Sequence, residues 1–465
     1  MTPGQAALRA GAIRKMVVGV VLGAILLWLP EPQGLSPQGK DALVLFGLLV
    51  YFWATEALPL PVTALGAGVG LVVLGIVDTP NEAWSPYAQD TIFFLLGSLI
   101  LADAVTKTDT DRILSARILR VMGRSTDSLL LAIILASSLP AMVISDHAVA
   151  AVMVPLVISM LRATDLLGRP NIAAAYMLAI AFGANIAGLA TPSGGARNAI
   201  VLGYLDELHG IRIGYLEWAL HAVPITLVLI PVVFLVLKTV FRVPHEPIDR
   251  AALALDRSRL DRTQRTTLAI IGGTVALWMV LGEEIGLGTV AIIGAVSLFV
   301  LGILDWVDTR RRIAWGVPLI YGAALTMGAA LKETGAAEWL ARTLLGASPW
   351  DTATALLLTA LVVTVLLTNF MSDGGTTAVL APVTLSIAAL AAVPVDQMGL
   401  ATAIGSAFSF VLVIGTPPNV IAYSSGLFST KDIAKAGSVL TVVALAVMVV
   451  VVTVYWPLLD RLGWG

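Results

Sequence analysis

Two stretches of this 465-residue sequence decide its fold: residues 145–152 read SDHAVAAV, and residues 372–379 read SDGGTTAV. Each stretch places a Ser-Asp pair between apolar segments, several of which are shorter than the about 20 residues that a bilayer crossing needs. Short hydrophobic segments with a polar interruption are typical of discontinuous membrane helices. The two stretches therefore predict two broken helices, at related positions in the two halves of the chain.

Other motifs repeat at nearly the same spacing. The offset from Lys107 to Lys332 equals the offset from Thr191-Pro192 to Thr416-Pro417, and it is close to the offset between the two Ser-Asp pairs. Three motifs in one order and at nearly one spacing indicate an internal duplication. With about five crossings in each copy, the second copy is inverted in the membrane relative to the first. Inverted repeats with paired broken helices are the architecture of secondary transporters.

The composition agrees with a chain surrounded by lipid. Of its residues 58% are hydrophobic and only 12% are charged, and the mean hydropathy is +0.92. A soluble domain carries about 25% charged residues, so the composition excludes a soluble enzyme, a nucleic-acid binder and a disordered chain. The net charge of −2 offers no basic surface for nucleic acid. The absence of cysteine excludes disulfides and thiolate metal sites.

We predict an all-α polytopic membrane protein with about 11 transmembrane helices in two inverted repeats, each with a re-entrant hairpin and a broken helix. The hairpins are expected at residues 90–105 and 314–331, with Gly97 and Gly322 at their middles. The expected organisation is an N-terminal anchor helix, a first repeat, a cytoplasmic linker and a second repeat, over residues 1–41, 42–242, 243–265 and 266–465.

Basic residues set the expected orientation. Arg9, Arg14 and Lys15 precede the first apolar run, and residues 238–265 are rich in arginine. The positive-inside rule places both segments in the cytoplasm. The final span follows Lys435 and ends outside. We therefore expect a multi-pass protein of the plasma (inner) membrane, with a cytoplasmic N-terminus and an extracytoplasmic C-terminus.

Four helix breaks are expected to meet near the midplane of the membrane, at residues 145–147, 191–198, 372–375 and 415–419. Backbone that leaves a helix at membrane depth has unpaired N–H and C=O groups, so it must line a polar cavity. Free N–H groups at the start of a half-helix attract anions, and free carbonyl groups coordinate cations such as sodium.

The motifs at these breaks resemble those of a known family. The segment Gly415-Thr416-Pro417-Pro418-Asn419, and the serines that lead the two broken half-helices, are similar to the signatures of the divalent anion/sodium symporters, which carry dicarboxylates, citrate and sulfate. Lys332-Glu333-Thr334-Gly335 resembles part of their second hairpin. The resemblance runs from about residue 45 to the C-terminus. It implies a small-molecule anion as substrate, no catalytic residues, and a homodimer in the lipid bilayer.

The breaks and the resemblance together give the candidate site. The candidate substrate-binding residues are Ser145, His147, Thr191, Ser193, Arg197, Asn198, Ser372, Gly374, Thr416, Pro417 and Asn419. The candidate cation-coupling residues are Asp146, Gly194, Asp373 and Gly415. Asp146 and Asp373 are expected to lie at two cation sites that carry the coupling. Sodium is the metal that this pattern allows at them, and a proton is the other candidate coupling ion; no further cofactor is expected.

The sequence departs from the family pattern at its most polar positions. The asparagine of the Ser-Asn-Thr signature is replaced by Asp146 in the first copy and by Asp373 in the second, and Arg197 replaces a proline beside the loop asparagine Asn198. An unpaired carboxylate at mid-membrane is costly. Each aspartate must bind a cation, hold a proton, or pair with Arg197 or a protonated His147. Arg197 could instead bind a substrate carboxylate or interact with the helix dipole at a half-helix end.

The sequence therefore predicts a secondary active transporter of small divalent anions, of the di- or tricarboxylate or sulfate type. Transport is expected to be coupled to sodium or protons, or to be an exchange, by alternating access of an elevator type. The alternative is a cation/proton antiporter on the same scaffold that uses Asp146 and Asp373. An intramembrane aspartyl protease is disfavoured because neither aspartate lies in a Gly-x-Gly-Asp motif.

Overall fold

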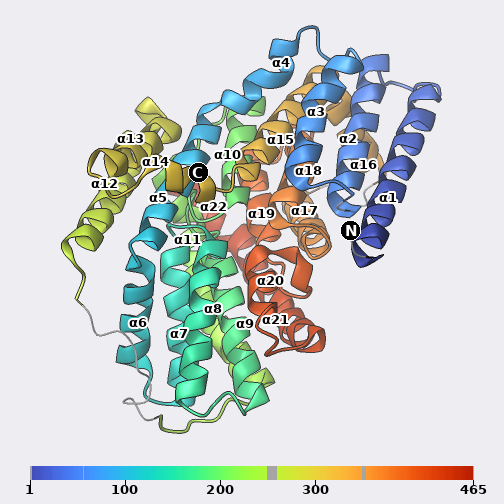
Figure 1. The fold of residues 1–465 in the computed structure, drawn as a ribbon. Helices are drawn as coiled ribbons and strands as arrows, with labels where there is room; N and C mark the ends of the chain where they lie inside the picture. The colour runs from blue at the N-terminus through green and yellow to red at the C-terminus, as the bar shows by residue number, and fades with distance from the viewer. Residues whose placement is uncertain (1–2, 56, 249–258, 348–351, 464–465) are drawn as a thin grey trace.

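The computed structural model describes residues 3–55, 57–248, 259–347 and 352–463. Within these ranges the chain is helical and contains no β-strand, which confirms the predicted all-α class. The helices form one elongated bundle, with the N-terminal helix along one edge (Figure 1). The predicted linker 243–265 falls partly outside the described residues, and so do its Arg250 and Arg257.

The first half of the chain begins with helices that lead to a bent pair. These are α1 (Pro3–Trp28), α2 (Pro37–Thr55), α3 (Leu60–Val73), α4 (Pro80–Trp84), the 3-10 turn η1 (Ser85–Ala88), α5 (Asp90–Lys107) and α6 (Thr110–Met122). The broken helices and the helices that follow are α7 (Thr126–Ala141), α8 (Asp146–Ala163), α9 (Pro170–Ala187), α10 (Ala196–His209) and α11 (Tyr215–Val240).

The second half follows the same order. Its leading helices are α12 (Arg262–Ile285), α13 (Leu287–Val300), α14 (Trp306–Arg312), α15 (Gly316–Glu333) and α16 (Ala336–Ala347). Its remaining elements are α17 (Ala353–Thr368), α18 (Asp373–Leu390), α19 (Val395–Ser406), η2 (Val413–Gly415), α20 (Pro417–Tyr423), α21 (Thr430–Val450), the π-helical segment η3 (Val451–Tyr455) and α22 (Trp456–Arg461).

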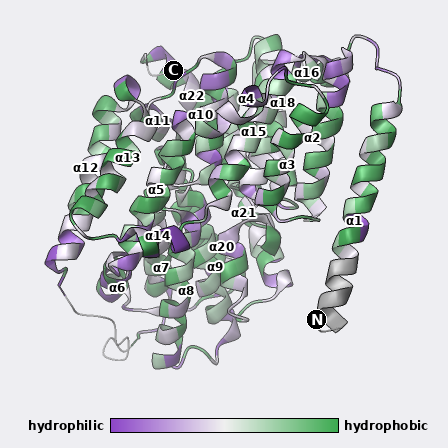
Figure 2. Cartoon of the chain, turned by 45° about the horizontal axis from the view of Figure 1, so that its top comes forward, coloured by the Kyte–Doolittle hydropathy of each residue, from purple (hydrophilic) through white to green (hydrophobic). Residues whose placement is uncertain are grey.

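The outer helices expose apolar side chains along their lengths. Figure 2 shows hydrophobic residues along the helices, whereas hydrophilic residues gather near helix ends and loops. Val300 is 77% exposed and Val280 is 73% exposed. In contrast, α9 is buried at almost every residue, so it lies at the centre of the bundle. Exposed apolar helices around a buried helix fit a protein that lipid surrounds.

Seven helices within the described residues are long and apolar enough to cross a membrane, and the number rises to nine if each of two bent pairs forms one span. Four further apolar helices, α3, α7, α13 and α17, are shorter. The fold therefore confirms a polytopic protein, while the number of about 11 spans stays a prediction.

The predicted positions of the two hairpin bends are wrong. Helices α5 and α15 run without interruption through Gly97 and Gly322. The bends lie before them, by 41° between Pro80–Ala88 (α4 with η1) and α5, and by 61° between α14 and α15. Each glycine instead permits close packing: a Cβ on Gly97 would lie 2.5 Å from the Cβ of Ala291, and one on Gly322 would overlap the ring of Tyr87.

The two halves pack against each other in a crossed manner. Helix α5 of the first half packs on α13 of the second, and α15 of the second half packs on α3 of the first. The broken helices also correspond, because Pro155 of α8 and Pro382 of α18 each stand nine residues after the aspartate that begins the helix. These correspondences agree with the duplication that the sequence indicates.

Candidate functional site

The two helix breaks predicted at the Ser-Asp pairs are present. Helix α7 ends at Ala141 and α8 begins at Asp146, and helix α17 ends at Thr368 and α18 begins at Asp373. In each case the aspartate is the first residue of the new helix. Asp146 Oδ1 accepts a hydrogen bond from the N–H of His147 at 2.8 Å, and Asp373 Oδ1 accepts one from the N–H of Gly374 at 2.7 Å. Free N–H groups and the helix dipole thus stabilise both carboxylates.

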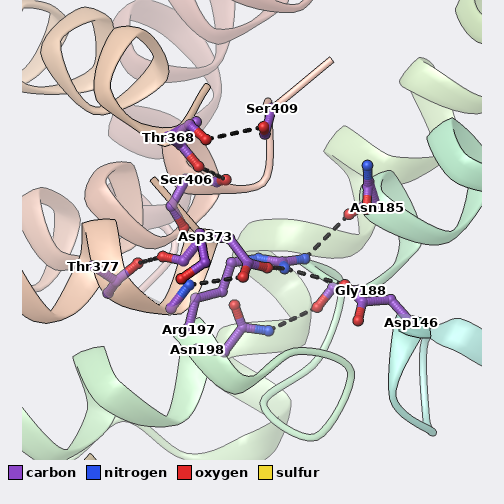
Figure 3. A network of polar contacts seen from close by, with 12 residues as sticks. Asp146, Asn185, Gly188, Arg197, Asn198, Thr368, Asp373, Thr377, Ser406 and Ser409 are labelled. Atoms are coloured by element: carbon purple, nitrogen blue, oxygen red, sulfur yellow. Dashed lines mark hydrogen bonds and ion pairs between the residues drawn. The ribbon is translucent and has the colours of Figure 1, made fainter. Parts of the chain in front are cut away.

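Arg197 joins the two breaks. Its Nη1 donates to Asp146 Oδ2 at 3.2 Å and to Asp373 Oδ2 at 2.5 Å, as Figure 3 shows. Its Nη2 donates to the backbone oxygen of Asn185 at 3.1 Å, and the side chain is completely buried. We call Asp146, Arg197 and Asp373 the buried triad. The triad links the first half of the chain to the second half.

The position of Arg197 decides between two of its predicted roles. Arg197 is the second residue of α10, so it lies at a helix N-terminus. The dipole at that end disfavours a cation, and a favourable dipole role would need the opposite end of a helix. The two carboxylates, rather than the dipole, therefore hold the guanidinium in place.

Two glycines leave the space that the guanidinium fills. A Cβ on Gly188 would lie 2.8 Å from Arg197 Nη2, and a Cβ on Gly195 would lie 3.0 Å from Arg197 Cζ. Both glycines belong to the break between α9 and α10. The break therefore accommodates the arginine that follows it.

Asn198 and Asn419 stabilise the other two breaks through equivalent hydrogen bonds. Asn198 Nδ2 donates to the backbone oxygens of Gly188 at 2.8 Å and Thr191 at 2.7 Å. Asn419 Nδ2 donates to those of Ser409 at 2.7 Å and Leu412 at 3.1 Å. Each asparagine thus donates to the backbone oxygens of the residues ten and seven positions before it.

This equivalence corrects one of the sequence matches. The offset from Asn198 to Asn419 equals the offset from Thr191 to Leu412, so Thr191 corresponds to Leu412 and not to Thr416. The two Thr-Pro pairs lie in related loops but at different positions within them. The asparagines, rather than the threonines, mark the repeat at these breaks.

Direct hydrogen bonds join the two halves around the triad. Asn185 Nδ2 donates to Asn419 Oδ1 at 3.0 Å. The hydroxyl of Tyr204 on α10 donates to the backbone oxygens of Ala324 at 2.7 Å and Ala378 at 3.0 Å. Neither Asn185 nor Tyr204 was among the predicted site residues. A fully buried asparagine in the Ala-rich α9 was a signal for Asn185, because polar side chains inside a membrane are rare and functional.

The remaining polar candidates of the first half lie around the first break. Ser145 Oγ lies 2.5 Å from His147 Nδ1, which in turn lies 3.4 Å from Asp146 Oδ1. The hydroxyl of Thr191 donates to the backbone oxygen of Met142. The structure places Ser193 Oγ 3.0 Å from the hydroxyl of Tyr215, a residue that sequence reasoning missed.

Candidates of the second half lie around the second break. Ser372 and Gly374 are partly exposed on either side of Asp373, as Ser145 and His147 are around Asp146. Thr416 is buried, and among the described residues its hydroxyl has no hydrogen-bond partner. Pro417 is exposed. A cavity of about 220 Å³ reaches Ser372 from between α2, α3 and the second break.

Two predicted glycines pack tightly in their loops. A Cβ on Gly194 would lie 2.9 Å from the backbone oxygens of Ala141 and Gly188. A Cβ on Gly415 would overlap Ser409 Oγ. Any larger residue would displace these loops, so both glycines shape the breaks.

At each of the two predicted cation sites, Asp146 and Asp373, a sodium ion would compete with the guanidinium. All four carboxylate oxygens of the two aspartates accept N–H hydrogen bonds, two from backbone and two from Arg197. In this arrangement the two carboxylates do not fit a sodium ion between them.

The chain is similar to known membrane transporters over nearly its whole length. The family model described as "Sodium:sulfate symporter transmembrane region" matches residues 11–462. The sodium-dependent dicarboxylate transporter SdcS of Staphylococcus saprophyticus is 26% identical, over 96% of this chain and 92% of that protein. An uncharacterized transporter of Haemophilus influenzae is 27% identical, over 95% of this chain and 96% of that protein.

Solved structures share the fold. The YdaH transporter of Alcanivorax borkumensis has a TM-score of 0.56 at 15% identity, and the match covers 98% of both chains. MtrF of Neisseria gonorrhoeae has a TM-score of 0.55 at 12% identity, covering 96% of this chain and 94% of that one. Both likenesses concern the fold alone. The match of the family model over nearly the whole chain shows that this membrane protein belongs to the sodium:sulfate symporter family.

Proposed function

We propose that this chain is a secondary active transporter of small divalent anions, either di- or tricarboxylates or sulfate. The observation that carries the proposal is the meeting of two half-helix N-termini, those of α8 and α18, at one buried polar site. Helix N-termini present several free N–H groups to anions, and of these groups each aspartate accepts only the N–H of the residue after it. The family supports this function, and the relatives named SdcS are sodium-dependent dicarboxylate transporters.

The partly exposed residues around the triad are suited to the anion. Ser145, His147, Ser372 and Gly374 flank the two aspartates, and the buried Thr416 has an unused hydroxyl among the described residues. Hydroxyl and N–H groups donate to carboxylate or sulfate oxygens, which accept charge-assisted hydrogen bonds. The cavity at Ser372 gives such an anion a route to the second break.

The transport cycle that we propose is of the elevator type. The moving part contains the broken helices and the helices that hold them, because the triad and the Asn185–Asn419 bond tie these elements together. The scaffold contains the early helices of each half. Two inverted halves can exchange conformations and so expose the site alternately to each side.

Coupling to a cation, or exchange of one anion for another, would drive the cycle. The names of the family and of the SdcS relatives favour sodium. The cation/proton antiporter receives less support, because it needs Asp146 and Asp373 free to exchange cations and Arg197 binds both. We further propose a homodimer in the inner membrane with a cytoplasmic N-terminus and an extracytoplasmic C-terminus.

Proteoliposomes that contain the purified chain would test the proposal with labelled succinate, citrate and sulfate. Uptake of one of them above that of empty liposomes is expected, whereas labelled acetate should enter no faster than it enters empty liposomes. Cation-driven movement of protons, with no anion uptake, would instead establish the antiporter. Failure of all three anions to enter or exchange would refute the proposal.

The variant Thr416→Val tests where the anion binds. A hydrogen bond to a charged group contributes about 1.5–3 kcal/mol, so the KM for the transported anion should rise by about tenfold or more. Thr63→Val on α3 is the matched control, because Thr63 is also buried and its hydroxyl also lacks a partner among the described residues. An equal KM for the two variants would show that the Thr416 hydroxyl does not bind the anion.

A further inference from the structure

We infer that Arg197 is a resident cation that takes the place of coupling sodium at Asp146 and Asp373, so that anion transport by this chain does not depend on sodium. The inference rests on the proposed function and narrows it. It also differs from what the names of the SdcS relatives say of those proteins.

The geometry of Arg197 is the first observation that supports the inference. One nitrogen, Nη1, lies within hydrogen-bond distance of carboxylate oxygens from both halves of the chain. The side chain is completely buried, and Nη2 is fixed by the backbone oxygen of Asn185. The guanidinium therefore occupies the point at which a shared ion would contact both aspartates.

The local charges carry the second step. Two carboxylates face one guanidinium, and each carboxylate also accepts an N–H hydrogen bond in the first turn of an 18-residue helix. A helix N-terminus carries roughly half of a positive charge. One guanidinium and two helix N-termini thus balance two carboxylates without any bound metal ion. A sodium ion placed beside them would be repelled by Arg197 in a medium of low dielectric constant.

The chemistry of arginine carries the third step. A guanidinium stays protonated in proteins, and Arg197 is covalently attached to α10. Unlike sodium, it cannot leave on one side of the membrane and return from the other. A site that keeps its cation through the whole cycle cannot use that cation to couple transport to a sodium gradient.

Two measurements on the unmodified chain test the inference. The melting temperature of the purified protein, followed by tryptophan fluorescence, should be the same in sodium chloride and in choline chloride of equal ionic strength. Uptake of labelled succinate into proteoliposomes should also be equal in the two salts. A coupled ion changes the affinity for its co-substrate by about 5- to 150-fold, whereas the expected change here is none.

Variants at position 197 add a positive signal. In Arg197→Ala the vacated site should admit sodium, so sodium should now raise the melting temperature in a saturable manner. Arg197→Lys keeps a tethered cation and should stay insensitive to sodium. If Arg197→Ala does not fold, the wild type and Arg197→Lys still decide the question.

The outcomes separate the inference from the proposed function. A saturable sodium-dependent rise in the melting temperature of the wild type, or a loss of succinate uptake of about fivefold or more without sodium, would overturn the inference. A folded Arg197→Ala variant whose melting temperature does not change with sodium would overturn the inference as well. Succinate, citrate and sulfate could all fail to enter in either salt while the melting temperature is the same in sodium and choline. That result would refute the proposed function, but Arg197 would still be supported as the resident cation.

Discussion

Replacing Arg197 by alanine should destabilise the protein strongly. The substitution removes the guanidinium from Asp146 Oδ2, at 3.2 Å, and from Asp373 Oδ2, at 2.5 Å. Both carboxylates lie in the interior, where Asp146 is 4% exposed and Asp373 is 9% exposed. Removing one partner of a buried ion pair costs about 3–5 kcal/mol. Because two carboxylates lose their partner, we expect a loss in the free energy of unfolding at the upper end of this range.

A compensating triple variant tests the cause of that loss. Arg197→Met combined with Asp146→Asn and Asp373→Asn removes the cation and both negative charges together. Neutral groups of similar size often replace buried ions at little cost, so the triple variant should lose less than about 2 kcal/mol. The difference from Arg197→Ala measures the coupling within the triad.

Denaturant unfolding in detergent, followed by tryptophan fluorescence, gives the free energies of unfolding. Arg169→Ala is the matched control, because Arg169 also pairs with a carboxylate, that of Glu246, but these two side chains are 44% and 45% exposed. Exposed pairs contribute little, so this control should unfold like the wild type. Equal losses for Arg197→Ala and the triple variant would refute the account, because the unpaired charges would then not be the cause.

Three further predictions concern the breaks and the packing around them. Asn419→Ala leaves the backbone oxygens of its loop without donors and should cost about 1–3 kcal/mol, measured by unfolding, with a loss of anion uptake. Gly437→Ala would make a Cβ overlap a backbone oxygen of the loop between α19 and α20 and should lower the melting temperature, whereas Gly272→Ala, which meets nothing within 4 Å, should not. Asp103→Asn weakens the two-pronged pair with Arg312, at 2.6 and 3.0 Å, and should cost about 1–2 kcal/mol in unfolding experiments.

Much of the architecture could be predicted from the sequence because lipid makes the pattern strict. Polar interruptions in apolar segments are costly in a membrane, so the Ser-Asp pairs at 145 and 372 marked both helix breaks correctly. Asp146, Arg197 and Asp373 form one cluster, although they lie far apart along the chain.

The positions of bends could not be predicted as well. Gly97 and Gly322 were expected at turns, but each lies inside a helix where another part of the chain comes close. Glycine permits both a turn and a close approach, and only the packing partner distinguishes them. The sequence does not identify the partner of Arg197 for a similar reason, because spacing along the chain does not say which carboxylate a buried guanidinium reaches.

An electron cryomicroscopy reconstruction in sodium-containing buffer would test the central claim most directly. The account predicts continuous density from the guanidinium of Arg197 to the carboxylates of Asp146 and Asp373, with no separate ion between them. An Arg197 side chain turned away from both aspartates, with density for an ion coordinated by their oxygens, would contradict the account.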